Sequence, residues 1–166
     1  MIKMTAKLGL FATLLFLTML QGCSSNAFHL RKNIELAPNY QRVQLENLSD
    51  DDGFKDAFEL ALEDAGGRLS EKANTVISFI NFREGRRAVA YNKDRKARVY
   101  LLFLKFEYDI AINNKKLEKR RITLDKTFVY DADFALGKAE EESQIKEDLY
   151  AEAARLILLR LQYSDR

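Results

Sequence analysis

The sequence predicts an α+β domain in which a four-stranded mixed sheet carries two helices packed on one face, in the order β-α-β-β-β-α. Three observations lead to this prediction. An apolar stripe with helical spacing lies between two short segments that are typical of strands. Two longer segments with a period of two flank an Asn-Asn-Lys-Lys turn, and a long charged segment with one apolar side closes the chain.

The first half of the domain is expected to supply a strand, a helix and a second strand. Residues 40–46 alternate in part and predict the first strand. Residues 75–83 are β-branched and aromatic and predict the second, which we expect to lie parallel to the first because such crossovers usually do. The helix between them begins after possible N-caps at 49–52 and ends at Gly66-Gly67. Its apolar stripe consists of Phe54, Ala57, Phe58, Ala61, Leu62 and Ala65.

The second half is expected to form an antiparallel hairpin followed by a long helix. In the third strand, 99–112, every even position is large and apolar, whereas the odd positions change from apolar to charged after Phe103. The turn at 113–116 leads to a fourth strand at 118–130. The closing helix, 139–163, has glutamates in its first turn and arginines near its end, which suits the helix dipole.

This topology places two loops at the same end of the sheet. If the first two strands are parallel, the loops at 84–98 and 131–138 share the end that is farthest from Cys23. The 113–116 turn then lies at the near end, together with a basic cluster that either contacts anionic headgroups or is a charged hairpin end. That cluster consists of Lys115, Lys116, Lys119, Arg120 and Arg121.

The far end carries most of the charge that could serve a function. Without residues 1–22 the chain has equal numbers of basic and acidic residues, so an electrostatic function needs local clustering. The 84–98 loop is strongly basic, and Lys138 from the other loop should join it. These cations suit an anion such as a phosphate, or else they keep a solvated hairpin soluble. The candidate ligands are Arg86, Arg87, Lys93, Arg95, Lys96, Arg98 and Lys138, with Arg83 beside them.

The apolar half of the third strand's second face also needs an explanation. Val99, Leu101 and Phe103 should lie opposite the helix-covered face, where nothing predicted covers them. A partner protein, an acyl chain or a loop would each supply that cover.

The residues do not predict an enzyme, a cofactor or a metal site. His29 is the only histidine and Cys23 the only cysteine, so no ligand set or nucleophile pair is formed. Residues 50–52 are three aspartates without the spacing of a calcium loop, and a helix cap explains them better. The basic end has the charge to bind a nucleic acid. The N-terminal sequence, however, predicts export and a lipid anchor, and an exported, anchored protein is not expected to meet nucleic acid.

That N-terminus has the layout of a secretory signal. Lys3 and Lys7 precede an apolar run at 8–20, which is too short to span a bilayer. Leu20-Gln21-Gly22-Cys23 resembles the lipobox of bacterial lipoproteins. The resemblance implies a diacylglycerol on Cys23, with 1–22 as signal peptide, 23–39 as lipidated spacer and 40–166 as a single domain. Ser24 after the cysteine implies the outer membrane, with the anchor on its periplasmic side. The alternative is an ordinary signal peptide with an incidental cysteine.

Three further segments resemble the LptE family of lipopolysaccharide-assembly lipoproteins. They are Phe28-His29-Leu30-Arg31 shortly after the cysteine, Phe134-Ala135-Leu136-Gly137-Lys138, and the run at 149–157. The resemblance implies a non-enzymatic plug of the LptD-type outer-membrane β-barrel that helps the barrel fold and delivers lipopolysaccharide to the outer leaflet.

The resemblance also implies two basic contacts to lipopolysaccharide. Lys138 matches one of them. The other falls near Asn92, where Lys93, Arg95 and Lys96 are close enough to substitute. Two other functions remain open: a lipoprotein accessory of a lipid-transport ABC system, and a peptidoglycan-binding lipoprotein.

Overall fold

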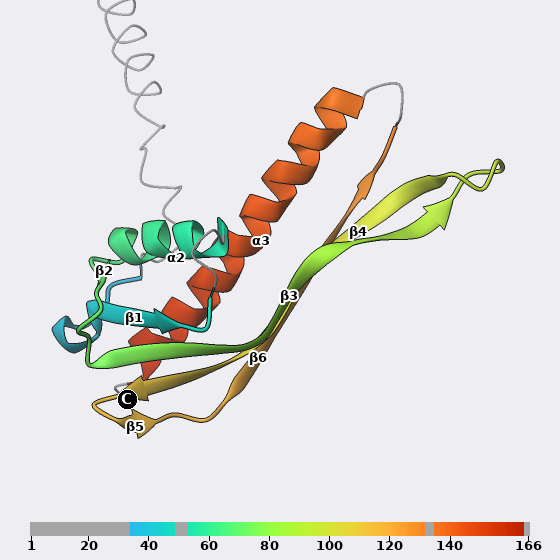
Figure 1. The fold of residues 1–166 in the computed structure, drawn as a ribbon. Helices are drawn as coiled ribbons and strands as arrows, with labels where there is room; N and C mark the ends of the chain where they lie inside the picture. Colours follow the sequence, from blue (N-terminus) through green and yellow to red (C-terminus); the bar gives the residue numbers. More distant parts are fainter. Residues whose placement is uncertain (1–33, 49–52, 132–134, 165–166) are drawn as a thin grey trace, which may run out of the picture. The chain divides into compact units, whose positions relative to one another are not determined.

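The computed structural model describes residues 34–48, 53–131 and 135–164, and the elements that they form are drawn in Figure 1. Within these ranges no helix is both long and apolar enough to cross a membrane. The elements, in chain order, are η2 (Pro38–Tyr40), β1 (Arg42–Glu46), α2 (Gly53–Asp64), β2 (Arg68–Leu69), β3 (Thr75–Tyr91), β4 (Ala97–Ile112), β5 (Lys115–Lys116), β6 (Arg120–Val129) and α3 (Ala135–Tyr163).

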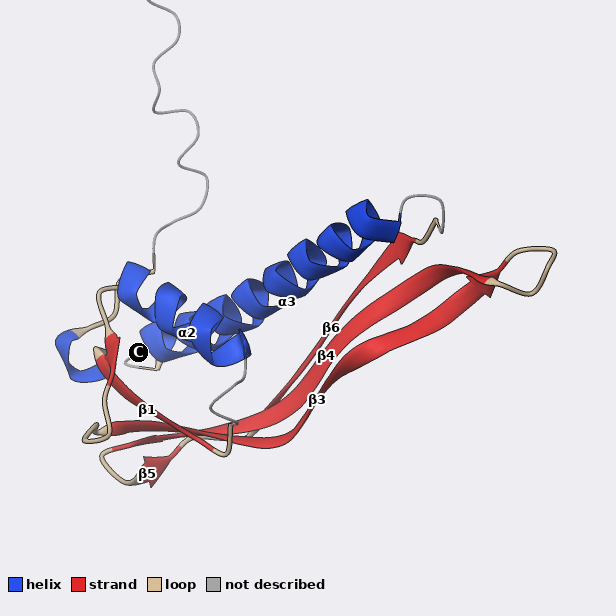
Figure 2. Ribbon diagram, turned by 45° about the horizontal axis from the view of Figure 1, so that its top comes forward, coloured by secondary structure: helices blue, strands red, loops and turns tan. Residues whose placement is uncertain are grey.

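The strands form one mixed sheet, as the sequence predicts. The strand order is β2-β1-β3-β4-β5, and β6 pairs with β4. The expected parallel pairing of the first crossover is confirmed between β1 and β3, and β4 is antiparallel to both β3 and β6. Both helices lie on the same side of the sheet (Figures 1 and 2). The strands β2 and β5 add to the predicted four, and at two residues each they are too short to show a pattern in the sequence.

Two sharp turns follow from residues that tolerate a left-handed backbone. Gly66 has φ 79° and ends α2 where the sequence predicts. Asn113 and Asn114 have φ values of 49° and 65° and form the two-residue connection between β4 and β5. The predicted N-cap residues of α2, at 49–52, lie outside the described residues.

The main core lies where both helices cover the sheet. The fully buried ring of Phe54, on α2, lies within 5.5 Å of the rings of Phe79 and Phe106, measured between centroids. The even positions of β4 from Leu102 to Ile110 are buried, as the alternation predicts. Leu36 is also buried in this core, so residues 34–39, which we expected to belong to a spacer, contribute to the folded body.

The prediction that the second strand ends at Arg83 and that 84–98 is an irregular loop is wrong. β3 continues to Tyr91, and only residues 92–96 remain as a turn before β4. The reason is a bulge between Ile80 and Arg83, in which Asn81 adopts φ 53°. The extra residue reverses which positions face the helices, so the alternation that marks a strand is interrupted at this point.

The prediction that the last helix begins at residue 139 is also wrong. α3 begins at Ala135, so Lys138 lies in its first turn and not in a loop. Gly137 and the absence of a clear capping residue hid this start in the sequence.

Together the long strands and α3 define two parts of the sheet. We call the part covered by both helices the near half. The far half comprises β3 from Arg83, β4 up to Phe103 and β6 from Asp125, and it faces only α3.

Candidate anion-binding surface at the hairpin tip

The turn between β3 and β4 is held in shape by one asparagine. The side-chain Oδ1 of Asn92 accepts hydrogen bonds from the backbone N–H groups of Asp94, at 3.0 Å, and Lys96, at 2.8 Å. The backbone N–H of Asn92 donates to the carbonyl of Lys96, at 2.9 Å. Arg95 adopts φ 61°, a left-handed conformation that favours glycine or asparagine. The turn therefore has a defined shape, and its side chains project from a fixed base.

The cations of this turn are open to solvent. Lys93, Arg95 and Lys96 are exposed, as are Arg98 on β4 and Arg87 on β3. None of the five forms an ion pair with a described residue, whereas seven other pairs occur in the described ranges. Because no carboxylate neutralises them, their charges can act on an external anion.

The two remaining candidates are neutralised by carboxylates of α3. Nη1 of Arg86 lies 2.6 Å from Oε2 of Glu142, and Nζ of Lys138 lies 2.5 Å from Oε2 of Glu141. The predicted cluster is therefore divided. The far end of the sheet does hold all seven side chains, but five of them are unpaired and two are engaged within the domain.

Further ion pairs tie α3 to the far half of the sheet. Glu84 on β3 pairs with Lys146 at 2.6 Å and accepts a hydrogen bond from the hydroxyl of Tyr150, and Lys126 on β6 pairs with Asp148 at 2.8 Å. Burial, with help from Glu84, raises the pKa of Tyr150 to about 12, and the hydrogen bond to Glu84 raises the pKa of Lys146. Sequence reasoning missed these contacts, and the only signal that could have pointed to them is that Glu84 interrupts a basic stretch.

A cavity of about 210 Å³ lies among these ties, lined by the acidic and basic partners together with Leu102, Leu104 and Leu149. Its charged side chains are already paired with one another. It therefore offers no unpaired cation to an anionic ligand.

The opposite face of the sheet, which we call the outer face, is divided by charge. In its far half β4 presents the three apolar side chains Val99, Leu101 and Phe103, all partly buried. Beyond them Lys105 is exposed, and Glu107 follows. No described helix or strand lies over this face (Figures 1 and 2). The loops of the described chain also do not cross over these three residues in either view, so a partner protein or an acyl chain remains as the cover.

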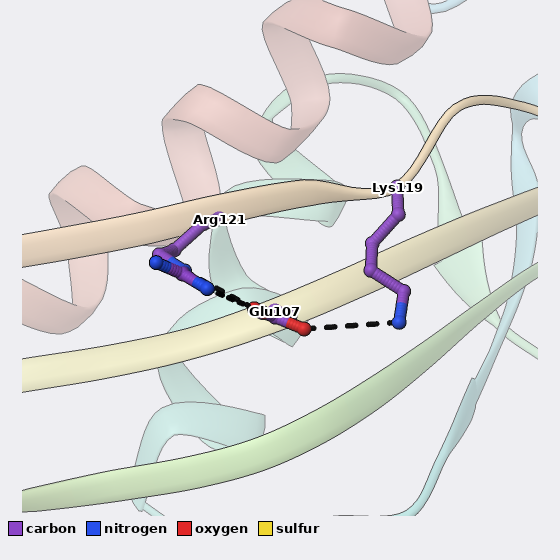
Figure 3. Close-up of polar contacts among 3 residues, drawn as sticks. All are labelled: Glu107, Lys119 and Arg121. Atoms are coloured by element: carbon purple, nitrogen blue, oxygen red, sulfur yellow. Dashed lines mark hydrogen bonds and ion pairs between the residues drawn. The ribbon is translucent and has the colours of Figure 1, made fainter.

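Glu107 lies in the near half of the outer face, between Arg121 and Lys119 (Figure 3). Its Oε1 lies 2.5 Å from Nη2 of Arg121, and its Oε2 lies 3.7 Å from Nζ of Lys119. The hydrogen bond from Arg121 lowers the pKa of this carboxyl group. Two cations of the near-end cluster are thus paired with Glu107, and Arg120 pairs with Glu118 at 2.9 Å. Three of the five cations of the near cluster are therefore paired, whereas Lys115 and Lys116 have no ion pair with a described residue.

Catalytic or metal-binding groups do not accompany these charges. Across residues 34–48, 53–131 and 135–164, no three histidine, cysteine, aspartate or glutamate side chains are grouped so that they could hold a metal ion. His29, Cys23 and the aspartates at 50–52 lie outside these ranges.

The fold is similar to those of several solved lipoproteins. A minor lipoprotein from Acinetobacter baumannii aligns with a TM-score of 0.59 and 20% identity, covering 74% of this chain and 91% of that one. Rare lipoprotein B from Shewanella oneidensis aligns with a TM-score of 0.62 and 17% identity, covering 75% and 96%. An uncharacterized lipoprotein B from Nitrosomonas europaea aligns with a TM-score of 0.58 and 20% identity, covering 82% and 90%. At these identities the likeness concerns the fold alone.

Sequence comparison identifies the family. A comparison with curated proteins gave no significant match. A family model described as LptE, lipopolysaccharide-assembly, matches residues 40–161, which include every element from β1 to nearly the end of α3. The chain therefore belongs to the LptE family, a non-enzymatic accessory family of lipoproteins with a role in lipopolysaccharide assembly and outer-membrane biogenesis.

Proposed function

We propose that this protein binds lipopolysaccharide through the unpaired cations of the hairpin tip while it assists an LptD-type β-barrel of the outer membrane. The observation that carries the proposal is the contrast in pairing at the far end. Five exposed cations there have no carboxylate partner among the described residues, whereas Arg86 and Lys138 are engaged by α3. Phosphate groups of a glycolipid are the complementary ligand, because charge-assisted hydrogen bonds to phosphate are strong and directional.

The pairing also suggests different roles for the predicted contacts. Lys93, Arg95, Lys96, Arg98 and Arg87 are available to bind phosphate directly. Lys138 exchanges its partner Glu141 for a phosphate only at the expense of an existing ion pair. It therefore adds less to affinity than the tip lysines.

Anchoring and partnership complete the proposal. The N-terminal pattern supports a lipid on Cys23, removal of residues 1–22 and a position on the periplasmic side of the outer membrane. The domain, as delimited by residues 40–166, then acts as the plug of the barrel and helps it fold. Family membership supports this partner class, and the outer face, over which no described element lies, leaves surface for it.

The tip is tested with a pair of matched double substitutions. Lys93→Glu with Lys96→Glu reverses two exposed lysines at the hairpin tip, and Lys115→Glu with Lys116→Glu reverses two exposed lysines at the near turn. Binding of purified lipopolysaccharide is measured by equilibrium titration at low and moderate salt, with circular dichroism as a control for folding. We expect the tip variant to weaken binding by about tenfold or more, mostly at low salt, and the near variant to bind like the wild type.

Equal affinity of the tip variant and the wild type would contradict the proposed site. Equal losses in the two variants would also contradict it, because they would indicate an effect of net charge without a defined surface.

The partner is tested in membranes. The full chain should co-purify with a large outer-membrane barrel protein after detergent extraction, and Cys23→Ala should leave the protein in the soluble periplasmic fraction. Recovery of the wild type as a free monomer would contradict the plug role.

The second candidate is an accessory lipoprotein of a lipid-transport ABC system. It is supported only by the anchor and the small α+β domain, and co-purification with an inner-membrane transporter would favour it.

A further inference from the structure

The outer face of the far half carries an apolar strip along β4, which one rung extends onto β3 and β6. On the rung closest to the tip, Val99 pairs with Ala90 of β3 and Val129 of β6, and Val129 is 49% exposed. Leu101 and Phe103 extend the strip along β4, toward the middle of the sheet. The strip therefore runs parallel to the strand direction and reaches the edge of the cationic tip.

A glycine opposite the ring of Phe103 widens this strip. Gly85 is the cross-strand partner of Phe103, and a Cβ atom at Gly85 would lie 3.2 Å from Cζ of the ring. The ring thus lies over the β3 backbone and covers it. Nζ of Lys105 lies 5.5 Å from the centroid of the same ring, so the far edge of the strip meets a cation.

Unpaired cations border the strip on the β3 side. Arg87 is the cross-strand partner of Leu101, and Arg83 is the partner of Lys105. Neither arginine forms an ion pair with a described residue, and both are exposed. On the helix-covered face of the same strands, Arg86, Lys126 and Lys146 are each paired with a carboxylate. Within the far half of the sheet, the cations without an ion pair therefore lie on the outer face and at the tip.

Asp125 is the one carboxylate on the three apolar rungs of the outer face. It lies opposite Phe103 on β6, on the side away from the arginines. The strip consequently has a cationic border along β3 and a polar border along β6, where Thr123 and Thr127 accompany Asp125. Such an asymmetric surface suits a ligand that is anionic on one side only.

We propose that this strip binds the acyl chains of an anionic glycolipid, with its phosphates directed toward Arg83, Arg87 and the tip. The inference rests on the proposed function and assigns the apolar part of the same ligand to one face of the sheet. A phosphorylated sugar without acyl chains would leave the strip uncovered, and an uncharged apolar partner would leave the arginines unpaired. A ligand with both parts satisfies both surfaces.

The experiment separates the two parts of the ligand. The probes are bis-phosphorylated lipid A and its fully de-acylated disaccharide bisphosphate, and the readout is the dissociation constant of each for the full-length protein. Leu101→Thr with Phe103→Thr removes the apolar strip while retaining β-propensity, and Arg83→Gln with Arg87→Gln removes the cationic border. Leu60→Gln is the matched control, because Leu60 is 63% exposed on α2, away from the strip.

We expect the threonine variant to bind lipid A about tenfold more weakly and the de-acylated probe as the wild type does. The glutamine variant should bind both probes more weakly, and Leu60→Gln should change neither constant. In addition, a photoactivatable aromatic residue in place of Phe103 should crosslink to lipid A, whereas the same residue in place of Leu60 should not. This second measurement keeps the ring and so does not depend on the stability of the threonine variant.

Unchanged lipid A binding in the threonine variant, together with no crosslink from position 103, would overturn the inference. If the tip variant Lys93→Glu with Lys96→Glu still weakened binding in that case, the proposed function would stand and only the assignment of the acyl chains would fail. A crosslink from position 103 to the barrel protein and not to lipid would also overturn it, and would make the strip a protein contact.

Discussion

The two halves of the sheet are stabilised in different ways. In the near half the ring of Phe54 packs among five other aromatic rings from β3, β4, α2 and α3, and both helices cover the sheet. In the far half the buried cluster consists of only Leu102, Phe128 and Leu149 with a few partly buried neighbours. There α3 is held to the strands mainly by ion pairs, such as Glu84 with Lys146 and Arg86 with Glu142.

This difference bears on where we propose that the binding surface lies. A dense core supports the near half, and three cations on its surface are paired with carboxylates, as Glu107 shows with Lys119 and Arg121. The far half extends beyond α2 and keeps cations unpaired on its outer face and tip. The larger core therefore lies in one half of the sheet, and the cations that we propose as the binding surface lie in the other.

The largest effect should come from removing the central ring of the near half. Phe54→Ala deletes a fully buried side chain, so we expect the free energy of unfolding to fall by about 4 kcal/mol. Denaturant unfolding followed by circular dichroism measures this loss. Leu60→Ala, on the exposed side of the same helix, should change stability by less than about 0.5 kcal/mol. A loss below about 1 kcal/mol for Phe54→Ala would show that this ring is not the centre of the core.

A smaller effect is expected in the cluster of the far half. Leu149→Ala removes a side chain that is 3% exposed, but its surroundings are small and partly open, so about 2 kcal/mol is expected. Hydrogen exchange should speed up in residues 97–103 more than in residues 104–112. Equal acceleration in both segments would mean that the halves do not differ in local stability.

The contacts of Glu84 with Lys146 and Tyr150 should make the stability of the domain depend on pH in the alkaline range. The pKa of Tyr150 is raised to about 12 from 10.0, chiefly by burial, and that of Lys146 is raised by Glu84. The folded state therefore retains protons that the unfolded state releases, so stability is complete below about pH 10 and falls as pH rises toward 12. Tyr150→Phe should reduce this fall by about 1 kcal/mol across that interval. Urea unfolding at pH 9 and pH 11.5 measures the difference, and identical slopes in wild type and variant would exclude Tyr150 as its source.

The smallest expected change in stability concerns the tip and separates folding from function. Arg95 has φ 61°, which a residue with a Cβ atom adopts at a cost, so Arg95→Gly should stabilise the domain by up to about 1 kcal/mol. The same change removes an unpaired cation and should weaken lipopolysaccharide binding. Thermal unfolding and a binding titration on the same sample test both expectations. A variant that gains stability and keeps full affinity would exclude Arg95 from the site.

Much of the fold could be predicted from the sequence because its strongest patterns coincide with buried surfaces. The even positions of β4 and the apolar stripe of α2 face the core, and Gly66 ends that helix. The continuation of β3 beyond Arg83 could not be predicted in this way. A bulge at Asn81 changes the parity of the strand, and the residues after it are mostly exposed and charged.

The candidate site was predicted as a set of residues but not as an arrangement. The sequence shows seven cations near one end of the sheet, yet their pairing depends on which face of β3 and which turn of α3 each occupies. The bulge places Arg86 toward Glu142 and Arg87 toward the outer face, and the early start of α3 places Lys138 beside Glu141. Charge patterning along the chain cannot separate neutralised from unpaired cations here. The pair of Arg86 with Glu142 joins residues far apart in the sequence, and the pair of Lys138 with Glu141 depends on where α3 begins.

The most direct test is a titration of isotope-labelled protein with lipid A, followed by two-dimensional amide NMR spectra. We expect the largest shift changes in residues 83–101, at the tip and along the outer face, and only small ones in residues 107–121 of the near half. Shift changes confined to the near half, or spread evenly over both halves, would contradict the claim that lipopolysaccharide binds at the unpaired cations of the far half.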